Sequence, residues 1–515
     1  MRAFDTSNWA PDYETDVLVV GYGGAGACAA MAAHDAGCKV TILEKLSHGG
    51  GATRLSSGGI FVGKGEEFSD YLYSIWNHNT DKELIDTYVK YDMELVDWFK
   101  KIGVDITFWK GNSQEVSVSY PPLGRPSWPA VKGGNLIRVH ATDPDEHGFT
   151  DEEWGKMTNN ERVWAIGRTY GVHLWNQLKA RTEEREGIDI QYQVRAKELI
   201  QDNDGAVLGI VAEKDGKEVT YRAKATILCT GGYGSNEQMK KDTMMCPFVY
   251  LGTNDFATGD GQIMLQKAGA HMWHWNSVCG QIAFKAPEYD QAFQVRAVDE
   301  AFVWVDKKGS RYTNEVKVVL HNAWRKASLY EPDGSSLEDG SQWPRIPLYM
   351  VFDEQMRKKA PISRDWRPNN DYNWSLDNSE EIKKGWIIKA DTLDELCEKT
   401  GMDPEMLKGT IDRFNEACES GIDEFGRDPK TMRPINQGPF YAMPWVPCII
   451  STCGGAEHDK DSRVIGYDGK PIPRLYAVGE VSTAMGWLYE AGLGHSEQVI
   501  FGRIAGENAA KEAAL

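Results

Sequence analysis

A glycine-rich turn near the N-terminus constrains the fold of this chain more than any other feature of its sequence. The stretch VLVVGYGGAGACAA contains the pattern G-x-G-x-x-G as Gly21, Gly23 and Gly26. The apolar run Asp16–Val20 before it predicts a buried parallel strand, and the small residues of Ala25–Ala36 predict a helix. A strand that turns through glycines into a helix is typical of the first unit of a nucleotide-binding α/β fold.

The next strand completes this fingerprint. Lys39–Glu44 (KVTILE) predicts a second parallel strand, which ends in the acidic residue Glu44. The three glycines permit a tight turn, close approach of the backbone to a pyrophosphate, and close packing of helix on strand. Gly24 and Ala25 lie at the helix start, where N–H groups and the positive end of the helix attract phosphates. Because Glu44 can accept hydrogen bonds from a ribose diol, the sequence predicts a dinucleotide site.

The segment after Glu44 separates NAD from FAD. It reads EKLSHGGGATRLSSGGIFV and contains a second polar, glycine-rich loop. A nicotinamide site has no need of such a loop, whereas a flavin has a long ribityl chain and a ring edge that glycine N–H groups can line. The expected contacts are Lys45, Gly51, Ala52, Thr53, Ser57, Gly58 and Gly59.

Further motifs follow in an order that a known family shares. They are ATILCTGGYGSN (225–236), ATGDG (257–261), GSRYTNE (309–315) and GYDGKPIPRLYAVGEVS (466–482). Together with the two glycine-rich segments, they resemble the flavoprotein superfamily of fumarate reductase and succinate dehydrogenase over most of the chain. The resemblance implies FAD as cofactor. Some members attach FAD to a histidine near the GG-A-T-R segment, and His48 lies just before it, but we expect noncovalent binding.

The resemblance also implies the fold. We expect an α/β protein with a Rossmann-like, glutathione-reductase-type FAD-binding domain and an inserted α+β substrate (capping) domain. The FAD-binding domain would span residues 1–277 and 447–515, and the capping domain residues 278–446. The helix that starts at Gly494 would point its N–H groups at the flavin. The further FAD contacts implied are Ala196, Thr230, Gly231, Gly232, Asn236, Thr258, Gly259, Asp260, Gly479, Glu480, Gly494, Ser496 and Val499.

The superfamily's shared reaction moves a hydride between flavin N5 and one carbon while a proton moves on the neighbouring carbon, beside a carbonyl. Fumarate reductases keep an arginine five residues after the asparagine of R-[FY]-x-N-E, where this chain has Val319. Their H-G-A-N-R-L-G-G pattern is replaced by W-L-Y-E-A-G-L-G, with Tyr489 near the arginine's place. Because a dicarboxylate needs cations at both ends, a C4-dicarboxylate substrate is not expected.

The turn at Tyr489 is instead similar to that of the Δ1 and Δ4-(5α) 3-ketosteroid dehydrogenases, whose tyrosine polarises or protonates the substrate carbonyl. A neutral phenol donates a hydrogen bond that strengthens as charge develops on the oxygen, and the Gly492 N–H would complete an oxyanion hole. Tyr120 in SYPPLGRP and His321 in NEVKVVLHNAW are further candidates for proton transfer. The substrate expected from this resemblance is a bulky, 3-ketosteroid-like enone.

The surroundings of these residues leave several points open. Trp304, Trp324 and Trp343 in the middle of the chain would suit the walls of an apolar pocket, although such tryptophans more often belong to a core. One alternative substrate is a smaller unsaturated carboxylate, bound by Arg325 or Arg125. Another alternative is a flavoprotein electron-transfer subunit. The direction of the reaction and the external electron donor or acceptor stay open, and no second G-x-G-x-x-G predicts an NAD(P)H site.

Composition excludes several classes of partner. Lys and Arg number 57 against 76 Asp and Glu, and a net charge of −19 argues against nucleic acid. The 9 cysteines form no CxxC or ferredoxin-type cluster, so no metal, haem or iron–sulfur site is expected. No apolar run reaches the roughly 20 residues that span a bilayer, and the polar N-terminus does not resemble a signal peptide. These features predict a cytoplasmic protein without membrane insertion.

Overall fold

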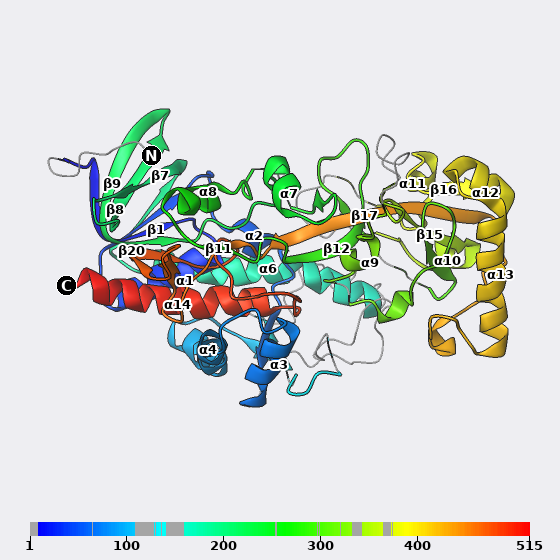
Figure 1. The fold of residues 1–515 in the computed structure, drawn as a ribbon, viewed down its shortest axis with the longest axis horizontal. Coiled ribbons are helices and arrows are strands. Elements are labelled where there is room, and N and C mark those ends of the chain that lie inside the picture. The colour runs from blue at the N-terminus through cyan, green and yellow to red at the C-terminus, as the bar shows by residue number, and fades with distance from the viewer. Residues whose placement is uncertain are drawn as a thin grey trace, which may run out of the picture.

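Both ends of the chain contribute strands to one sheet, at the left of Figure 1. The protein is described from a computed structural model, which covers residues 9–515 except 64, 109–127, 129, 135, 141–158, 253–254, 296, 298, 320, 332–341, 364–371 and 373. The strands of this sheet, in spatial order, are β19 (Arg463–Ile465), β20 (Pro471–Ala477), β9 (Lys217–Leu228), β1 (Tyr13–Val20), β2 (Val40–Glu44) and β6 (Ile188–Tyr192). Of these six strands all but β19 run parallel, as a doubly wound α/β sheet requires, and an antiparallel hairpin described below extends the sheet from the first residues of β9.

The two faces of this sheet are covered by different elements. Val17 and Val19 of β1 face one hydrophobic core, while Leu18 and Val20 face another. The first face is covered by α1 (Gly24–Asp35), α4 (Lys82–Lys101), α6 (Asn159–Glu183) and α14 (Leu493–Ala513). The second face is covered by the hairpin of β7 (Val194–Gln201) and β8 (Val207–Lys214) and by α8 (Asp260–Lys267). Burial on both faces explains why these strands read as continuous apolar runs.

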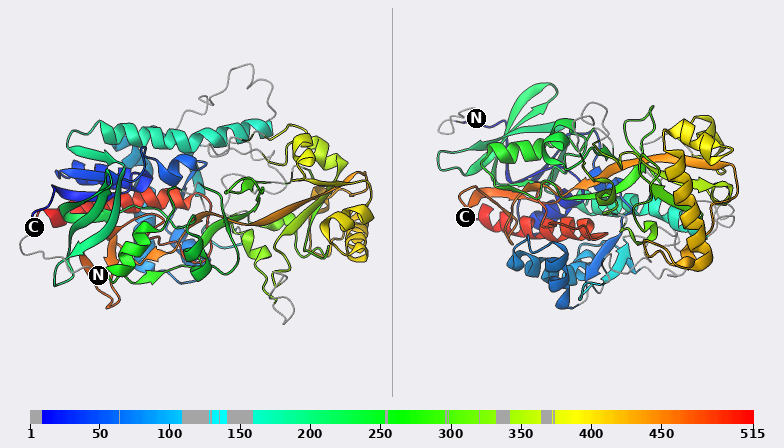
Figure 2. Two further views of the ribbon diagram at one scale, coloured as in Figure 1. Left: turned by 90° about the horizontal axis from the view of Figure 1, so that it is seen from above. Right: turned by 45° about the vertical axis from the view of Figure 1, so that its right-hand side comes forward.

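The first and last helices, α1 and α14, lie side by side because both present small residues at their contact (Figures 1 and 2). A Cβ atom added to Gly502 would lie 2.9 Å from the Cβ of Cys28. One added to Gly506 would lie 2.3 Å from the carbonyl oxygen of Ala29. The alanine-rich α1 thus receives the glycines of α14, and the contact joins the two ends of the chain.

A second sheet forms the core of the inserted region, at the right of Figure 1. Its strands are β10 (Val249–Tyr250), β12 (Val278–Phe284), β13 (Phe293–Gln294), β14 (Phe302–Val305), β15 (Leu348–Asp353), β16 (Ile388–Ala390) and β17 (Phe440–Thr452). The helices α10 (Glu354–Lys359), α11 (Ser379–Lys383), α12 (Leu393–Thr400) and α13 (Pro404–Ser420) lie at its far end. The long strand β17 continues across residue 446, and the domain boundaries stay a prediction.

Smaller elements connect these two parts. A three-stranded sheet is formed by β3 (Ile60–Gly63), β4 (Thr107–Phe108) and β5 (Leu136–His140), and a two-stranded sheet by β11 (Met272–Trp273) and β18 (Gly455–Ala456). The remaining helices include α2 (Gly51–Leu55), α3 (Glu67–Ile75), α7 (Glu237–Thr243) and α9 (Trp324–Ala327). Gln193, which has a φ of 59°, separates β6 from β7. No helix within the described ranges combines the length and apolarity needed to cross a membrane.

The tryptophans that were candidates for pocket walls belong mainly to packed cores. The Trp304 ring lies against that of Trp445, with centroids 5.6 Å apart, and both rings are buried in the inserted region. The Trp324 ring packs edge-on against Phe248 at 5.1 Å. Trp343 contacts Tyr330, with centroids 4.8 Å apart. These residues therefore stabilise the inserted region first of all.

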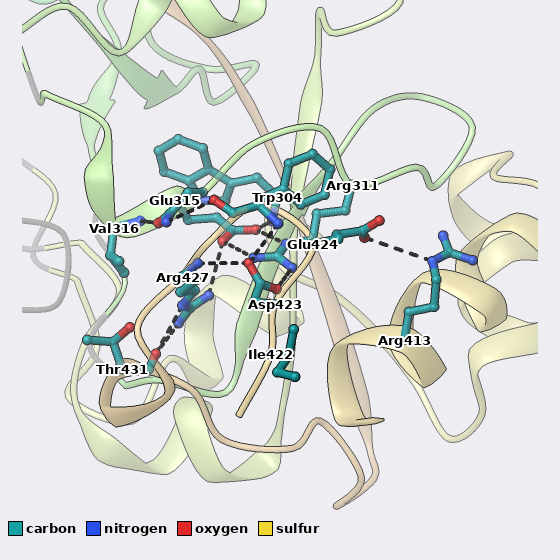
Figure 3. Close-up of polar contacts among 12 residues, drawn as sticks. Trp304, Arg311, Glu315, Val316, Arg413, Ile422, Asp423, Glu424, Arg427 and Thr431 are labelled. Atoms are coloured by element: carbon teal, nitrogen blue, oxygen red, sulfur yellow. Dashed lines mark hydrogen bonds and ion pairs between the residues drawn. The ribbon is translucent and has the colours of Figure 1, made fainter. Parts of the chain in front are cut away.

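A buried ion network closes the inserted region (Figure 3). Nε of Arg311 lies 2.8 Å from Oε1 of Glu315, and Nη1 of Arg427 lies 3.2 Å from Oε2 of the same carboxylate. Arg311 also pairs with Asp423, and none of these four side chains is more than 1% exposed. Asn314 caps the turn that begins at Glu315. The GSRYTNE motif therefore holds the loop before α9 to the segment after α13.

We expect Gly506→Ala to destabilise the protein, because its methyl group would collide with the backbone of α1. Overpacking of this kind costs about 1–3 kcal/mol. Gly409→Ala in α13 is the matched control, since its Cβ would meet only the movable end of Arg413 at 3.3 Å, and alanine favours a helix by up to about 1 kcal/mol. Denaturant midpoints of the two variants measure the difference. Equal midpoints would show that the α1–α14 contact tolerates a side chain.

Arg311→Met should leave the Asp423 carboxylate buried without its cation. Breaking a buried pair in this way costs about 3–5 kcal/mol. Arg413→Met provides the control, because Arg413 and Glu424 form an exposed pair at 3.9 Å, which Figure 3 also draws, and exposed pairs contribute about 1 kcal/mol at most. Urea unfolding of both variants tests this. A midpoint for Arg311→Met equal to that of the control would contradict a structural role for the network.

Candidate active site

The glycine turn after β1 leaves room for a ligand at Gly23 but not at Gly26. Gly21 has a φ of 102°, and a Cβ added to Gly26 would lie 2.0 Å from the carbonyl oxygen of Gly21. At Gly23 the nearest atom to such a Cβ is the Gly50 carbonyl oxygen, 3.7 Å away. Gly23 itself has no side chain to cap the start of α1, and the Gly24 N–H donates to the Thr53 side chain. The space and the N–H groups at this helix start fit the pyrophosphate that the sequence predicts.

Glu44 ends β2 beside this turn. Its carboxylate accepts hydrogen bonds from the backbone N–H groups of Tyr22 and Leu46, both at 2.9 Å. Burial raises the pKa of Glu44. The two bonds fix the carboxylate at the edge of the sheet next to the glycine turn, which is where a ribose-binding acid belongs in this fold.

A chain of hydrogen bonds connects three helices next to the turn. The Gly24 N–H donates to Oγ1 of Thr53 at 3.1 Å, and this hydroxyl donates to Oε1 of Gln498 at 2.9 Å. Nε2 of Gln498 lies 2.8 Å from Nδ1 of His495. Thr53 was expected at the site from its glycine-rich loop, whereas the role of Gln498 is visible only in the structure. The chain fixes α2 and α14 relative to the start of α1.

Several expected cofactor residues gather around Lys45. Its Nζ donates to Oγ1 of Thr258 at 2.6 Å and lies 3.4 Å from Oδ2 of Asp260. Arg195, next to Ala196 in β7, donates twice to Asp260, at 3.1 and 2.8 Å. Asn236 caps α7 and donates to the Thr258 carbonyl at 3.0 Å, and Gly259 precedes α8. The structure thus brings together motifs that lie far apart in the sequence.

The last strand brings the C-terminal motif to the same place. Gly479, which follows β20, would place a Cβ 3.4 Å from that of Ala25 in α1. The Glu480 carboxyl accepts hydrogen bonds from the Gly232 N–H and from Ser451, and burial raises the pKa of Glu480 to about 8. Gly231 follows Thr230 after β9, and no described atom lies within 4 Å of a Cβ added there. Open space at Gly231 and Gly23 fits an extended cofactor between the two ends of the chain.

The remaining expected contacts lie around the start of α14. The Ser496 hydroxyl donates to the Phe61 carbonyl at 2.6 Å, and Val499 packs in the core. The Gly58 N–H donates to Oγ of Ser56 at 3.0 Å. The other contacts expected in this region are Gly51, Ala52, Ser57, Gly59 and Gly494, which lie in α2, in the loop after it and in the first turn of α14. Ser496 and Val499 would meet a cofactor through their backbone, since their side chains are used in packing.

The Tyr489 hydroxyl is a candidate hydrogen-bond donor for a ligand. The ring is buried, and the Gly494 backbone N–H donates to its oxygen at the start of α14. Burial raises the pKa of Tyr489 well above that of a free phenol, so the group is neutral at pH 7. Within the described part of the chain no residue accepts the hydroxyl proton. Tyr489 is therefore arranged to donate a hydrogen bond to a ligand.

The segment before α9 holds Tyr489 in place. The ring centroids of His321 and Tyr489 are 5.5 Å apart. Nδ2 of Asn322 donates to the Tyr489 carbonyl at 2.9 Å, and the Tyr489 N–H donates to Oδ1 of Asn322 at 3.4 Å. The sequence singled out His321 and missed Asn322, whose paired amide contacts have no short motif. Tyr120, the other tyrosine expected here, lies outside the described residues.

Gly492 and Glu490 lie in the same turn as Tyr489, before the start of α14. Gly492 has a φ of 84°, and a Cβ added there would lie 1.9 Å from the Phe61 ring. The backbone N–H that donates to the Tyr489 hydroxyl is that of Gly494, and the role of the Gly492 N–H in an oxyanion hole for a substrate stays a prediction. The Glu490 carboxylate is fully buried and accepts from the Tyr71 hydroxyl and, at 3.0 Å, from the Ala491 N–H.

Comparison with known proteins identifies the family. Residues 16–494 match the model of the FAD binding domain family. The chain belongs to this family. It is an FAD-dependent oxidoreductase acting on CH–CH groups, and no group of three metal-ligating side chains occurs among the residues described. FAD is its cofactor, and fumarate reductases and a ketosteroid dehydrogenase are among its relatives.

Two relatives and one structure show the range of this flavoenzyme family. A probable fumarate reductase of Shewanella frigidimarina is 29% identical, covering 98% of this chain and 76% of the relative. A 3-oxosteroid 1-dehydrogenase of Mycolicibacterium smegmatis is 28% identical, and the match covers 92% of this chain and 93% of the relative. The crystal structure of 3-ketosteroid Δ1-dehydrogenase from Sterolibacterium denitrificans matches with a TM-score of 0.76 and 20% identity. The match covers 97% of this chain and 99% of the dehydrogenase chain. The last match confirms the expected fold.

We expect Gly23→Val to abolish FAD binding without unfolding the apoprotein. Its side chain would fill the space above the start of α1 and collide with a pyrophosphate, and a steric cost of about 3 kcal/mol weakens binding about 100-fold. The measurement is flavin content after gel filtration, with circular dichroism of the apoprotein. In Gly26→Ala, by contrast, the methyl group collides with Gly21, so the apoprotein itself should lose stability. Full flavin content in Gly23→Val would exclude this turn as the pyrophosphate site.

Proposed function

We propose that this flavoenzyme reduces or introduces a C=C bond conjugated to a carbonyl, and that Tyr489 donates a hydrogen bond to the carbonyl oxygen. The observation that supports this most directly is the buried Tyr489 hydroxyl, whose oxygen accepts from Gly494 and whose proton has no acceptor among the described residues. FAD, when bound, supplies the hydride acceptor or donor at N5. The protein has to orient the carbonyl and move one proton.

Tyr489 would act on the oxygen on which charge develops. During reduction a hydride adds to the β-carbon, negative charge moves to the carbonyl oxygen, and a proton adds to the α-carbon. A neutral phenol stabilises this charge without losing its own proton, and its raised pKa keeps it protonated at neutral pH. His321, whose ring lies next to that of Tyr489, is our candidate for proton transfer at the α-carbon. The reverse sequence of steps introduces the double bond.

The preferred substrate is a bulky, 3-ketosteroid-like enone. Val319 stands where fumarate reductases have their proton-donating arginine, and Tyr489 stands near their second arginine. The similarity to a 3-oxosteroid 1-dehydrogenase extends over 92% of the chain. We also propose noncovalent FAD, because His48, the histidine near the GG-A-T-R segment, has an exposed side chain. We also propose that the enzyme works in the cytoplasm.

A smaller unsaturated carboxylate is the second candidate substrate. The similarity to a fumarate reductase covers 98% of the chain, and Arg325 lies on α9, directly after the segment that holds Tyr489. The other arginine considered for this role, Arg125, lies outside the described residues. An electron-transfer subunit without substrate chemistry would not need a buried phenol next to His321 whose hydroxyl proton has no acceptor among the described residues.

Tyr489→Phe should reduce the rate at which conjugated ketones reoxidise the photoreduced enzyme by about 10²–10³-fold, the usual cost of losing one oxyanion donor. FAD should stay bound, because the ring is retained. Tyr330→Phe is the control, since Tyr330 is exposed and packs on Trp343. Stopped-flow absorbance of the flavin under anaerobic conditions measures both rates. A rate near that of the wild type in Tyr489→Phe would remove this hydroxyl from the mechanism.

A further inference from the structure

Arg325 is held in an unusual way close to the Tyr489 turn. Its guanidinium lies between two indole rings, 4.5 Å from the ring centroid of Trp324 and 4.7 Å from that of Trp487. One nitrogen, Nη2, donates to the Trp487 carbonyl at 2.6 Å. The buried Nε has no partner, and in the described part of the chain no carboxylate forms an ion pair with this arginine. Burial lowers the pKa of Arg325.

Such an arrangement is costly for a structural arginine. A buried N–H without an acceptor loses its hydration, and a partly buried cation is normally balanced by a carboxylate. The two arginines that are buried in the described part of the chain follow this rule, because Arg311 and Arg427 each pair with Glu315. Arg325 therefore has donor capacity that the described protein groups do not use, on a planar group that matches a carboxylate.

The position of Arg325 relates it to the reaction. Asn322, three residues earlier, forms both hydrogen bonds with the Tyr489 backbone, and Trp487 lies two residues before Tyr489. The Trp487 side chain is 39% exposed, so this end of the site faces solvent. The cation and the hydrogen-bond donor are thus fixed to each other by the same two segments.

We propose that Arg325 binds a carboxylate of the substrate, so that the substrate is a conjugated carbonyl compound carrying one negative charge. This deepens the proposed function and rests on it. Arg325 stands outside the two motif positions at which fumarate reductases keep their arginines, and it presents one guanidinium to one carboxylate. The indole ring of Trp487, which is 39% exposed, favours a flat apolar body next to that carboxylate. The negatively charged group can be the conjugated carboxylate itself or one remote from an enone.

Matched ligands separate charge from shape. Cinnamate and its neutral methyl-ketone analogue, benzylideneacetone, differ mainly in the carboxylate. 3-Oxo-4-cholenoate and its methyl ester make the same comparison with the carboxylate far from the enone. 3-Phenylpropionate has no C=C bond to reduce, so its titration against the photoreduced enzyme reports binding without turnover. The four unsaturated compounds are titrated against the FAD-loaded protein and are also mixed with the photoreduced enzyme to obtain an apparent Kd and a limiting rate.

Arg325→Gln should raise the Kd of 3-phenylpropionate, and the apparent Kd of at least one carboxylate substrate, by about 10–100-fold. This corresponds to the loss of a hydrogen bond to a charged group. The neutral member of that pair should bind within about 2-fold of its wild-type affinity, with an unchanged limiting rate. Arg325→Lys should restore part of the carboxylate affinity. Arg345→Gln is the matched control, because Arg345 also stacks on an aromatic ring, Tyr312 at 4.3 Å, and donates to a backbone carbonyl at 3.2 Å.

Other outcomes would overturn the proposal. Equal weakening of acids and ketones in Arg325→Gln would show that the arginine only positions the turn, and unchanged affinity for both would show that it contacts neither. If 3-phenylpropionate binds the wild type no more tightly than it binds Arg325→Gln, the arginine does not contact its carboxylate. If no conjugated carbonyl compound reoxidises the wild-type flavin, the proposed function fails, whereas the 3-phenylpropionate titration still decides whether Arg325 binds a carboxylate.

Discussion

The packing of α14 on α1 is the contact on which the rest of the molecule depends. Gly502 and Gly506 let the last helix approach the first one at backbone distance, and this brings the start of α14 to the glycine turn of β1. The cofactor region then lies between residues from opposite ends of the chain, joined by the Thr53–Gln498 hydrogen bond. Tyr489 is placed by the same contact, because its hydroxyl accepts from the first turn of α14.

The fold could be predicted where a local pattern has a single physical meaning. The βαβ unit that ends in Glu44 was expected, because glycine turns and continuous apolar runs identify buried parallel strands, and the last helix was implied by the family resemblance. The organisation of the inserted region was not predicted in detail. Its sheet is built around β17, which pairs with the earlier strands β10, β12, β15 and β16, and no local pattern encodes partners so far away in the sequence.

Site residues divide in the same way. Tyr489 and His321 were selected from motifs, and the structure places their rings in contact. Asn322 and Gln498 were missed because amide groups that position other residues follow no fixed spacing. GSRYTNE carried the family resemblance, yet its arginine and glutamate form a buried ion network away from the Tyr489 turn. A motif can therefore mark the family while its side chains hold the fold rather than the substrate.

The exchange of an arginine for Tyr489 and Glu490 changes the charge available for a substrate. The Glu490 carboxylate accepts hydrogen bonds from the Tyr71 hydroxyl and from a backbone N–H. Burial raises the pKa of Glu480 to about 8, so this carboxyl group is protonated at neutral pH. The turn after β20 thus offers a neutral hydroxyl rather than a cation. If a negatively charged substrate binds beside it, the compensating charge has to come from another element. On α9, Arg325 supplies a guanidinium whose Nε still lacks an acceptor. Dividing the two tasks between two segments allows a carbonyl to be activated by a phenol while a carboxylate is recognised separately.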